Sequence, residues 1–95
     1  MYHEIMKVTW DPGKAKINLR KHRIRFADVE PVFFDPMALT REDDDSEGEQ
    51  RFVSLGLDAL NRILVVVYTY WGTDIRLISA RRATSKERKH YDKGI

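Results

Sequence analysis

Cysteine is absent from this chain of 95 residues, which excludes a disulfide framework, a thiolate zinc site and a cysteine nucleophile. The five glycines stand apart from one another, so there is no glycine-rich phosphate loop. No histidine belongs to an HExxH or similar ligand set, and we therefore expect neither a metal nor another cofactor. The longest apolar run, residues 63–67, is too short to span a membrane. Without a secretory pattern at its start, the chain is expected to be cytoplasmic.

Acidic charge is concentrated in one short segment of a chain that is otherwise basic. The whole chain has 17 basic and 15 acidic side chains and a formal net charge of +2. Residues 41–50, the acidic segment, hold one arginine and six carboxylates, so the rest of the chain has a net charge of +7. A basic body favours a polyanion such as nucleic acid as the partner. Solvated surface lysines and arginines are the alternative explanation of the same composition.

The acidic segment, which reads TREDDDSEGEQRF with its flanking residues, begins like a calcium loop. Its carboxylates and Gly48 match the first half of an EF-hand loop. Gln50 and Ser54, however, stand where that loop needs an apolar residue and a bidentate carboxylate. A hydrated loop between strands is the simpler interpretation. Glu47 and Arg51, four residues apart at the end of the segment, are the positions from which functional groups could reach the sheet.

Periodic apolar positions and local capping signals divide the chain into strands and helices. Asp11 before Pro12 is typical of a helix start, and Thr84 with Glu87 three residues later forms a capping box. Residues 62–71 are apolar on both faces, which predicts a central strand joined to the next strand by a tight turn. The predicted order β-α-α-β-β-β-β-α covers residues 6–10, 12–22, 26–34, 37–41, 51–57, 62–71, 75–81 and 85–93.

This order of elements predicts a single α+β domain over residues 1–95. We expect one antiparallel sheet with helices mainly on one of its faces. Pro31 lies inside the helix predicted over residues 26–34, and proline is tolerated only in the first turn of a helix.

Two arginines of the last predicted strand are candidates for binding an anion. Arg76 and Arg81 stand beside apolar neighbours, where a guanidinium needs either a ligand phosphate or an ion pair within the protein, for example with Glu47, Glu49 or Glu87. His22 ends the first predicted helix, where it either stabilises the helix dipole or acts as a general acid or base.

A small basic domain that carries such groups is sufficient for the cleavage of RNA. The ribose 2′-OH attacks its own neighbouring phosphate, so the protein has to supply only a base, an acid and cations for the developing charge. DNA lacks this hydroxyl and would not be cut. The alternative is a non-enzymatic binding module, whose basic face holds RNA or a partner protein and cuts nothing.

Four ordered motifs of the chain resemble those of a known toxin family. They are W-D-P-x-K-x-x-x-N-x-x-K-H at residues 10–22, E-x-x-x-R-F at 47–52, I-R-x-I-S-A-R at 75–81 and E-R-x-x-Y at 87–91. With these motifs the chain resembles the BrnT family of type II toxin–antitoxin systems over nearly its whole length. The resemblance implies a metal-independent ribonuclease toxin of RelE-like fold, which inhibits translation by cutting RNA. It also implies a BrnA-type antitoxin with a ribbon-helix-helix DNA-binding part, in a complex of two toxin and two antitoxin chains.

Site residues are assigned where the chain matches the motifs of this family. Arg51, Arg76 and Arg81 are predicted to clamp phosphates, and His22 or Glu47 is predicted to act as the base. The predicted RNA-binding residues are Lys14, Lys21, Trp10, Lys86 and Tyr91.

Some of these assignments carry a structural alternative. Trp10 is expected either to stack on a nucleobase or to lie in the core. The chain also departs from the family at Pro31 and at Arg23, which stands where the family often has glycine. Both departures affect the corner after the first helix, and hence the direction in which His22 points.

Overall fold

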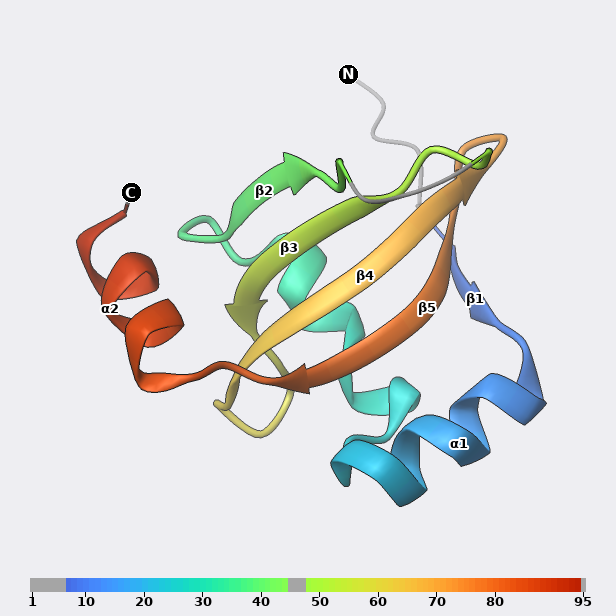
Figure 1. Ribbon diagram of the computed structural model, residues 1–95, viewed down its shortest axis with the longest axis horizontal. Helices are drawn as coiled ribbons and strands as arrows, with labels where there is room; N and C mark the ends of the chain where they lie inside the picture. Colours follow the sequence, from blue (N-terminus) through green and yellow to red (C-terminus); the bar gives the residue numbers. More distant parts are fainter. Residues whose placement is uncertain (1–6, 45–47, 95) are drawn as a thin grey trace.

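The computed structural model describes residues 7–44 and 48–94, which form one sheet with helices packed beside it. The sheet has five strands in the order β1-β5-β4-β3-β2, and Figure 1 shows β4 running through its middle. The strands are β1 (Val8–Trp10), β2 (Leu39–Glu42), β3 (Phe52–Leu57), β4 (Ile63–Trp71) and β5 (Asp74–Arg82). The α+β class is confirmed, as is the central position of the strand predicted over residues 62–71.

The direction of the first strand differs from the prediction of a wholly antiparallel sheet. β2, β3, β4 and β5 pair antiparallel in turn, and the turn after Trp71 joins β4 and β5 into the expected hairpin. β1 instead runs parallel to β5, with Val8 opposite Ile75 and Trp10 opposite Leu77. A parallel pair has to be joined by a long crossover, and local periodicity says nothing about the direction of so distant a partner.

Local capping signals start both α-helices where the sequence predicts them. The helices are α1 (Pro12–His22) and α2 (Ser85–Lys93). The Asp11 side chain accepts a hydrogen bond from the backbone N–H of Lys14 at 3.0 Å and so caps α1. Thr84 and Glu87 form the predicted capping box of α2, which ends at Gly94 in a left-handed conformation. None of the helices in the described part of the chain is long and apolar enough to cross a membrane.

The residue after α1 adopts a backbone conformation that favours glycine. Arg23 has a φ of 61°, and its N–H donates to the carbonyl of Leu19 at 2.9 Å. This left-handed cap closes the helix but strains a residue that has a Cβ atom. A glycine, such as the resembling family often has here, would adopt the same cap without that strain.

The prediction of one continuous helix over residues 26–34 is wrong. The structure has two short 3-10 helices there, η1 (Phe26–Asp28) and η2 (Glu30–Phe34). Pro31 lies in the first turn of η2, where its missing N–H is tolerated, whereas a helix running through it would lose a hydrogen bond. Val29 and Val32 of this segment are nonetheless fully buried, and Phe33 is partly buried against the core.

One face of the sheet carries the hydrophobic core, and the opposite face borders α2 at one end. Side chains of η1 and η2 pack on one face of β4 and β5, and Figure 1 shows these short helices behind the sheet. The core consists of Ile24, Phe26, Val29, Val32, Leu64, Val66, Tyr68, Ile75, Leu77 and Ala80. Because side chains alternate along a strand, the intervening residues face the other way. We call this the open face: Leu39, Arg41, Val53, Leu55, Val65, Val67, Thr69, Arg76, Ser79 and Arg81.

The acidic segment joins β2 to β3. Its two flanking elements are strands, as expected, whereas an EF-hand loop is flanked by helices. Asp45 and Glu47, which the calcium interpretation needs as ligands, lie outside the described residues.

Candidate nucleic-acid interface

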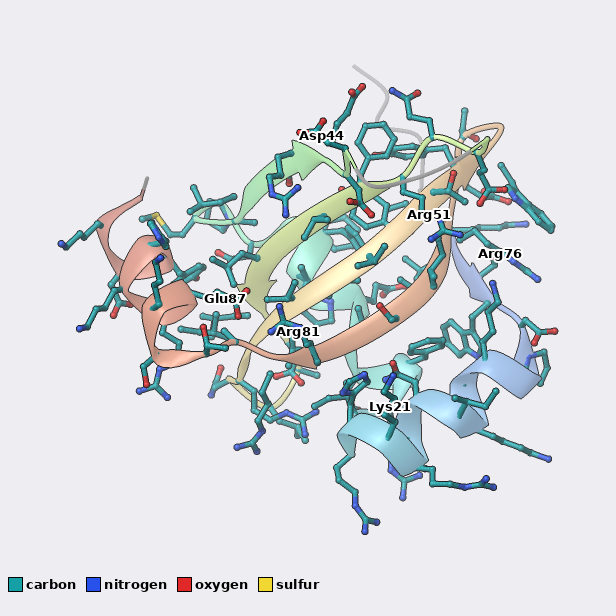
Figure 2. The ribbon with its side chains drawn as sticks, viewed as in Figure 1. Lys21, Asp44, Arg51, Arg76, Arg81 and Glu87 are labelled. Carbon is teal, nitrogen blue, oxygen red and sulfur yellow. The ribbon has the colours of Figure 1, made fainter. Side chains whose placement is uncertain are left out.

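Basic side chains form two groups at opposite ends of the open face. Cross-strand pairing places Thr69 opposite Arg76, and Val65 opposite Arg81. Residues of a strand rise about 3.3 Å each, so the four positions from Val65 to Thr69 separate the two groups by roughly 13 Å. Figure 2 shows Arg51 and Arg76 near the β4–β5 turn, and Arg81 at the end of the sheet beside α2. The three predicted phosphate clamps therefore do not converge on one point.

The group near the β4–β5 turn, which we call the hairpin group, consists of Arg51, Thr69, Trp71 and Arg76. The guanidinium carbon of Arg76 lies 4.2 Å from the centroid of the Trp71 ring, in a cation–π contact. The Thr69 hydroxyl donates to the Gln50 carbonyl at 2.6 Å and so fixes the chain that leads into β3. The Nε atom of Arg51 is buried without a hydrogen-bond partner. Neither Arg51 nor Arg76 forms an ion pair within residues 7–44 and 48–94.

At the other end of the open face, Arg81 is held by Glu87 of α2. The two Nη atoms of Arg81 donate to the two carboxylate oxygens of Glu87, each at 2.8 Å. Glu87 Oε1 also accepts the backbone N–H of Thr84 at 2.8 Å, as part of the capping box. One carboxylate thus both starts α2 and attaches it to β5, which is the ion-pair alternative considered for Arg81.

The bidentate pair changes the acidity of both partners. Hydrogen bonds from Arg81 lower the pKa of Glu87 from 4.5 to about 2, against the opposing effect of burial. The same hydrogen bonds raise the pKa of Arg81. The side chains of Arg81 and Glu87 are 39% and 29% exposed, so water screens the pair in part. Both groups are therefore charged throughout the neutral range.

A cavity of about 480 Å³ lies between the open face and α2. Apolar side chains of β2, β3 and β4 form its floor, and Arg41, Arg81, Glu87 and His90 stand around them. Because Glu87 already occupies the donor fork of Arg81, a phosphate bound here would have to displace that carboxylate.

Asn18 attaches α1 to the edge of β5. Its side chain is 4% exposed and donates to the carbonyls of Ile24 at 3.0 Å and Ala80 at 2.9 Å. It also accepts the backbone N–H of Ala80 at 2.9 Å. The pairing of β1 with β5 ends at Leu77. At Ala80, the Asn18 amide therefore satisfies the backbone N–H and C=O groups that a neighbouring strand would otherwise satisfy.

This attachment gathers three predicted site residues around a second cavity. Lys14, Lys21 and His22 of α1 line a cavity of about 190 Å³ together with Ser79 of β5. Lys14 and Lys21 are exposed, and His22 is half-buried. Since Ser79 lies between the two basic groups along β5, the histidine is located beside the middle of the open face.

A family model matches residues 10–87 of the chain, which is well over half of its length. The family is described as the ribonuclease toxin, BrnT, of type II toxin-antitoxin systems. The chain belongs to the BrnT family. It is therefore the ribonuclease toxin of a type II toxin–antitoxin system, and an antitoxin is its partner.

A solved member of the BrnT family has the same fold. The crystal structure of the ribonuclease toxin BrnT of Brucella abortus superposes with a TM-score of 0.66 at 25% sequence identity. The match covers 85% of this chain and 100% of that chain. A comparison with curated proteins gave no match. The resemblance inferred from the four motifs is thus confirmed, while the RelE-like label stays a prediction.

The other BrnT motif residues assigned to the site are Trp10, Tyr91, Lys86 and Glu47. Trp10 is half-buried, and its ring meets an aromatic ring of η1 edge-on at 6.0 Å, which is the core alternative for this residue. Tyr91 is 8% exposed, and its hydroxyl donates to Asp35 at 2.6 Å. Lys86 is exposed on the first turn of α2, and Glu47 lies outside the described residues.

Asp35 connects three parts of this BrnT-family fold. Besides the Tyr91 hydroxyl, its carboxylate accepts the backbone N–H groups of Leu57 and Met37, both at 2.9 Å. Burial raises the pKa of Asp35, but these hydrogen bonds lower it overall. Burial first, and then the bond to Asp35, raises the pKa of Tyr91 to about 12. Tyr91 is thereby kept as a neutral donor that fastens α2 to the end of η2.

Two residues that shape the site had no role assigned to them from the sequence. Asn18 is part of the first BrnT motif, yet only its contact with β5 shows that it positions α1. Trp71 stands beside Gly72 in the predicted turn, where a large exposed aromatic residue is itself a signal of binding. From the sequence, stacking on a base was considered for Trp10, with the core as its alternative, because Trp10 belongs to the family motif.

Potential metal ligands are dispersed in the structure. Within residues 7–44 and 48–94, no three histidine, aspartate or glutamate side chains are grouped so that they could hold a metal ion. The expectation that the toxin needs no cofactor stays a prediction.

Proposed function

We propose that this BrnT-family toxin is a metal-independent endoribonuclease. In the proposed reaction a ribose 2′-OH of the substrate loses its proton to a base and attacks the adjacent phosphorus. The bond from phosphorus to the 5′-oxygen breaks, and that oxygen receives a proton from an acid. The products are a 2′,3′-cyclic phosphate and a 5′-hydroxyl end, so no water and no redox step is needed. Cleavage of mRNA in this way would stop translation.

The observation that carries this proposal is the distribution of charge on the open face. Arg51 and Arg76 present guanidinium groups that no described carboxylate neutralises. Guanidinium groups bind phosphate oxygens through paired hydrogen bonds, and they stabilise the charge that develops on the phosphorane. The half-buried His22 lines a cavity together with Ser79, whose position along β5 is between Arg76 and Arg81.

Each group has a proposed role. His22, which lines a cavity together with Ser79, is the proposed proton-transferring residue, and Glu47 is the alternative base. Lys14 and Lys21 attract the RNA backbone into the cavity beside His22. Arg81 becomes a phosphate ligand when Glu87 releases it. Lys86 adds positive charge at the start of α2, and Tyr91 supports that helix from within.

The test is RNA cleavage by the purified toxin in excess EDTA. Wild-type protein should fragment RNA and leave DNA of the same sequence intact. His22→Ala should lower the rate by roughly 10²- to 10⁴-fold, the usual contribution of a general acid or base. Arg20→Ala is the matched control, because Arg20 is an exposed cation of the same helix that does not line the cavity. Cleavage abolished by EDTA would contradict a metal-independent mechanism.

If the His22→Ala protein is fully active, another residue must transfer the proton, and Glu47→Gln is the next variant to test. Intact RNA under all conditions, with binding retained, would instead establish the non-enzymatic binding module. The same assay therefore separates the two functions.

We further propose a BrnA-type antitoxin with a ribbon-helix-helix part as the partner, in a complex of two toxin and two antitoxin chains in the cytoplasm. The type II system of the family supports an antitoxin, and the resemblance of the motifs supports its type. Co-expression with the neighbouring gene should relieve growth arrest, and the mass of the purified complex in solution should equal two copies of each chain. A complex with one copy of each would refute the stoichiometry.

A further inference from the structure

Trp71 is exposed to an extent that its place in the fold does not require. It ends β4, immediately before the turn into β5, and is 57% exposed. A tryptophan contributes most to stability when it is buried, so an indole left in water at the tip of a hairpin contributes little to the core. Trp10 shows the contrast within the same chain, since it is half-buried against η1. The exposure of Trp71 therefore points to a role in binding.

The surroundings of Trp71 are those of a site for a nucleotide. Arg76 lies over its ring with 4.2 Å between the guanidinium carbon and the ring centroid. This contact orients the ring and keeps a positive charge beside it. Thr69 pairs with Arg76 across β4 and β5, and its hydroxyl fixes the segment that carries Arg51. Figure 2 shows Arg51 and Arg76 at the same end of the sheet.

We propose that Trp71 is a stacking platform for an unpaired nucleobase of the RNA substrate. The base stacks on the exposed part of the indole, and the adjoining phosphate is bound by Arg76 and Arg51. This inference deepens the proposed ribonuclease function and rests on it. It assigns the substrate class as single-stranded RNA, because a base held in a duplex has no free face to stack on an aromatic side chain.

The arrangement also accounts for the unpaired state of the two arginines. A guanidinium in an ion pair offers fewer donors to a phosphate, and Arg81 shows that state at the other end of the open face. Arg76 is instead positioned by a ring, which leaves its hydrogen-bond donors for the ligand. The hairpin group is thus ready to bind RNA without first breaking a contact within the protein.

The test measures binding to a 2′-O-methyl oligonucleotide, which keeps the bases and phosphates of RNA but lacks the attacking hydroxyl. Trp71→Ala should raise the Kd for the single strand about 5- to 100-fold, and Trp71→Phe should restore part of the affinity. Leu60→Ala is the matched control, because Leu60 is 60% exposed but lies in the turn between β3 and β4. Its Kd should equal that of the wild type.

Tryptophan fluorescence gives a second readout of the same titration. Stacking of a base on the indole should quench the emission of the wild type, and this quenching should be lost in Trp71→Phe, in which Trp10 alone emits. The preference of the wild type for single-stranded over duplex oligonucleotide should also shrink in Trp71→Ala.

The outcomes separate this inference from the proposed function. If Trp71→Ala binds the single strand as the wild type does, or if Trp71→Phe retains the quenching, the stacking role is overturned while RNA cleavage by the wild type still stands. If Trp71→Ala cleaves RNA poorly and binds it weakly, both proposals are supported. If the wild type binds no oligonucleotide and cleaves no RNA, both fall together.

Discussion

The ion pair between Arg81 and Glu87 predicts a stability difference that depends on pH. Glu87→Gln removes the charge, but glutamine at this position still completes the capping box of α2. A pKa lowered from 4.5 to about 2 corresponds to at most about 3 kcal/mol. Because both side chains are partly exposed, screening by water reduces this to about 1–2 kcal/mol, which is the expected loss in the free energy of unfolding at neutral pH.

The sign of the pH dependence follows from the direction of the shift. The pKa of Glu87 is lower in the folded protein, so its contribution is fully present above pH 4.5 and is lost as the pH falls towards 2. Glutamine does not titrate. The difference between wild type and Glu87→Gln should therefore be constant from neutral pH to about 4.5 and should vanish near pH 2.

Urea-induced unfolding of both proteins over this pH range is the assay, with midpoints and slopes analysed together. Glu49→Gln is the control, because Glu49 is exposed and forms no ion pair among the described residues. The free energy of unfolding of Glu49→Gln should differ little from that of the wild type, and the difference should not change with pH. A Glu87→Gln difference that is also flat, or one that grows as the pH falls, would refute the reasoning.

Three further substitutions have expected outcomes in the same unfolding assay. Asn18→Ala should lower the free energy of unfolding by about 2–4 kcal/mol, because it leaves the buried N–H and C=O groups of Ala80 without partners. A loss under about 1 kcal/mol would contradict the attachment of α1 through the Asn18 amide. Tyr91→Phe should cost about 1–2 kcal/mol through the lost bond to Asp35. The pKa of Tyr91 is raised from 10 to about 12 in the folded protein, so the stabilisation by its neutral hydroxyl is fully present below pH 10. This stabilisation is lost as the pH rises through 12. Tyr91→Phe has no such hydroxyl, so this contribution to the pH dependence should be seen in the wild type and not in the variant. Arg23→Gly should raise the free energy of unfolding by about 0.5–1 kcal/mol through relief of the left-handed backbone, and an unchanged value would mean that the cap carries no strain.

Elements whose signals are local were the ones that the sequence predicted well. α1 and α2 have the predicted bounds because Asp11, Thr84 and Glu87 cap them within a single turn. The hairpin of β4 and β5 follows from an apolar run and a tight turn. The helix over residues 26–34 was predicted from its apolar spacing, and Pro31 overrode that spacing by removing one backbone donor. The parallel direction of β1 is set by a partner more than sixty residues away, which no local pattern reports.

The candidate site was predicted only in part, for the same reason. The motif residues Lys14, Lys21 and His22 do line one cavity, because a single helix carries all three. Which arginine is neutralised depends on the docking of α2, so Arg81 and Arg76 could not be distinguished by their strand positions alone. Trp71 escaped notice because exposure is a property of the folded chain.

The position of β5 has a consequence for the order in which this toxin becomes active. β5 joins Val8 to Ile75 in one ladder, and Asn18 to Ala80 through a side chain, across sequence separations of more than sixty residues. Contacts of such long range cannot form until the later partner exists, and closing the intervening chain carries an entropic cost that slows folding. A nascent chain in which β5 has not yet been synthesised lacks the strand that pairs with β1 and the strand edge to which Asn18 attaches α1. It also lacks Arg76, which lies over Trp71 in the folded protein. The proposed RNA-binding surface therefore forms only after β5 has been synthesised, so a growing polypeptide that ends before β5 lacks it.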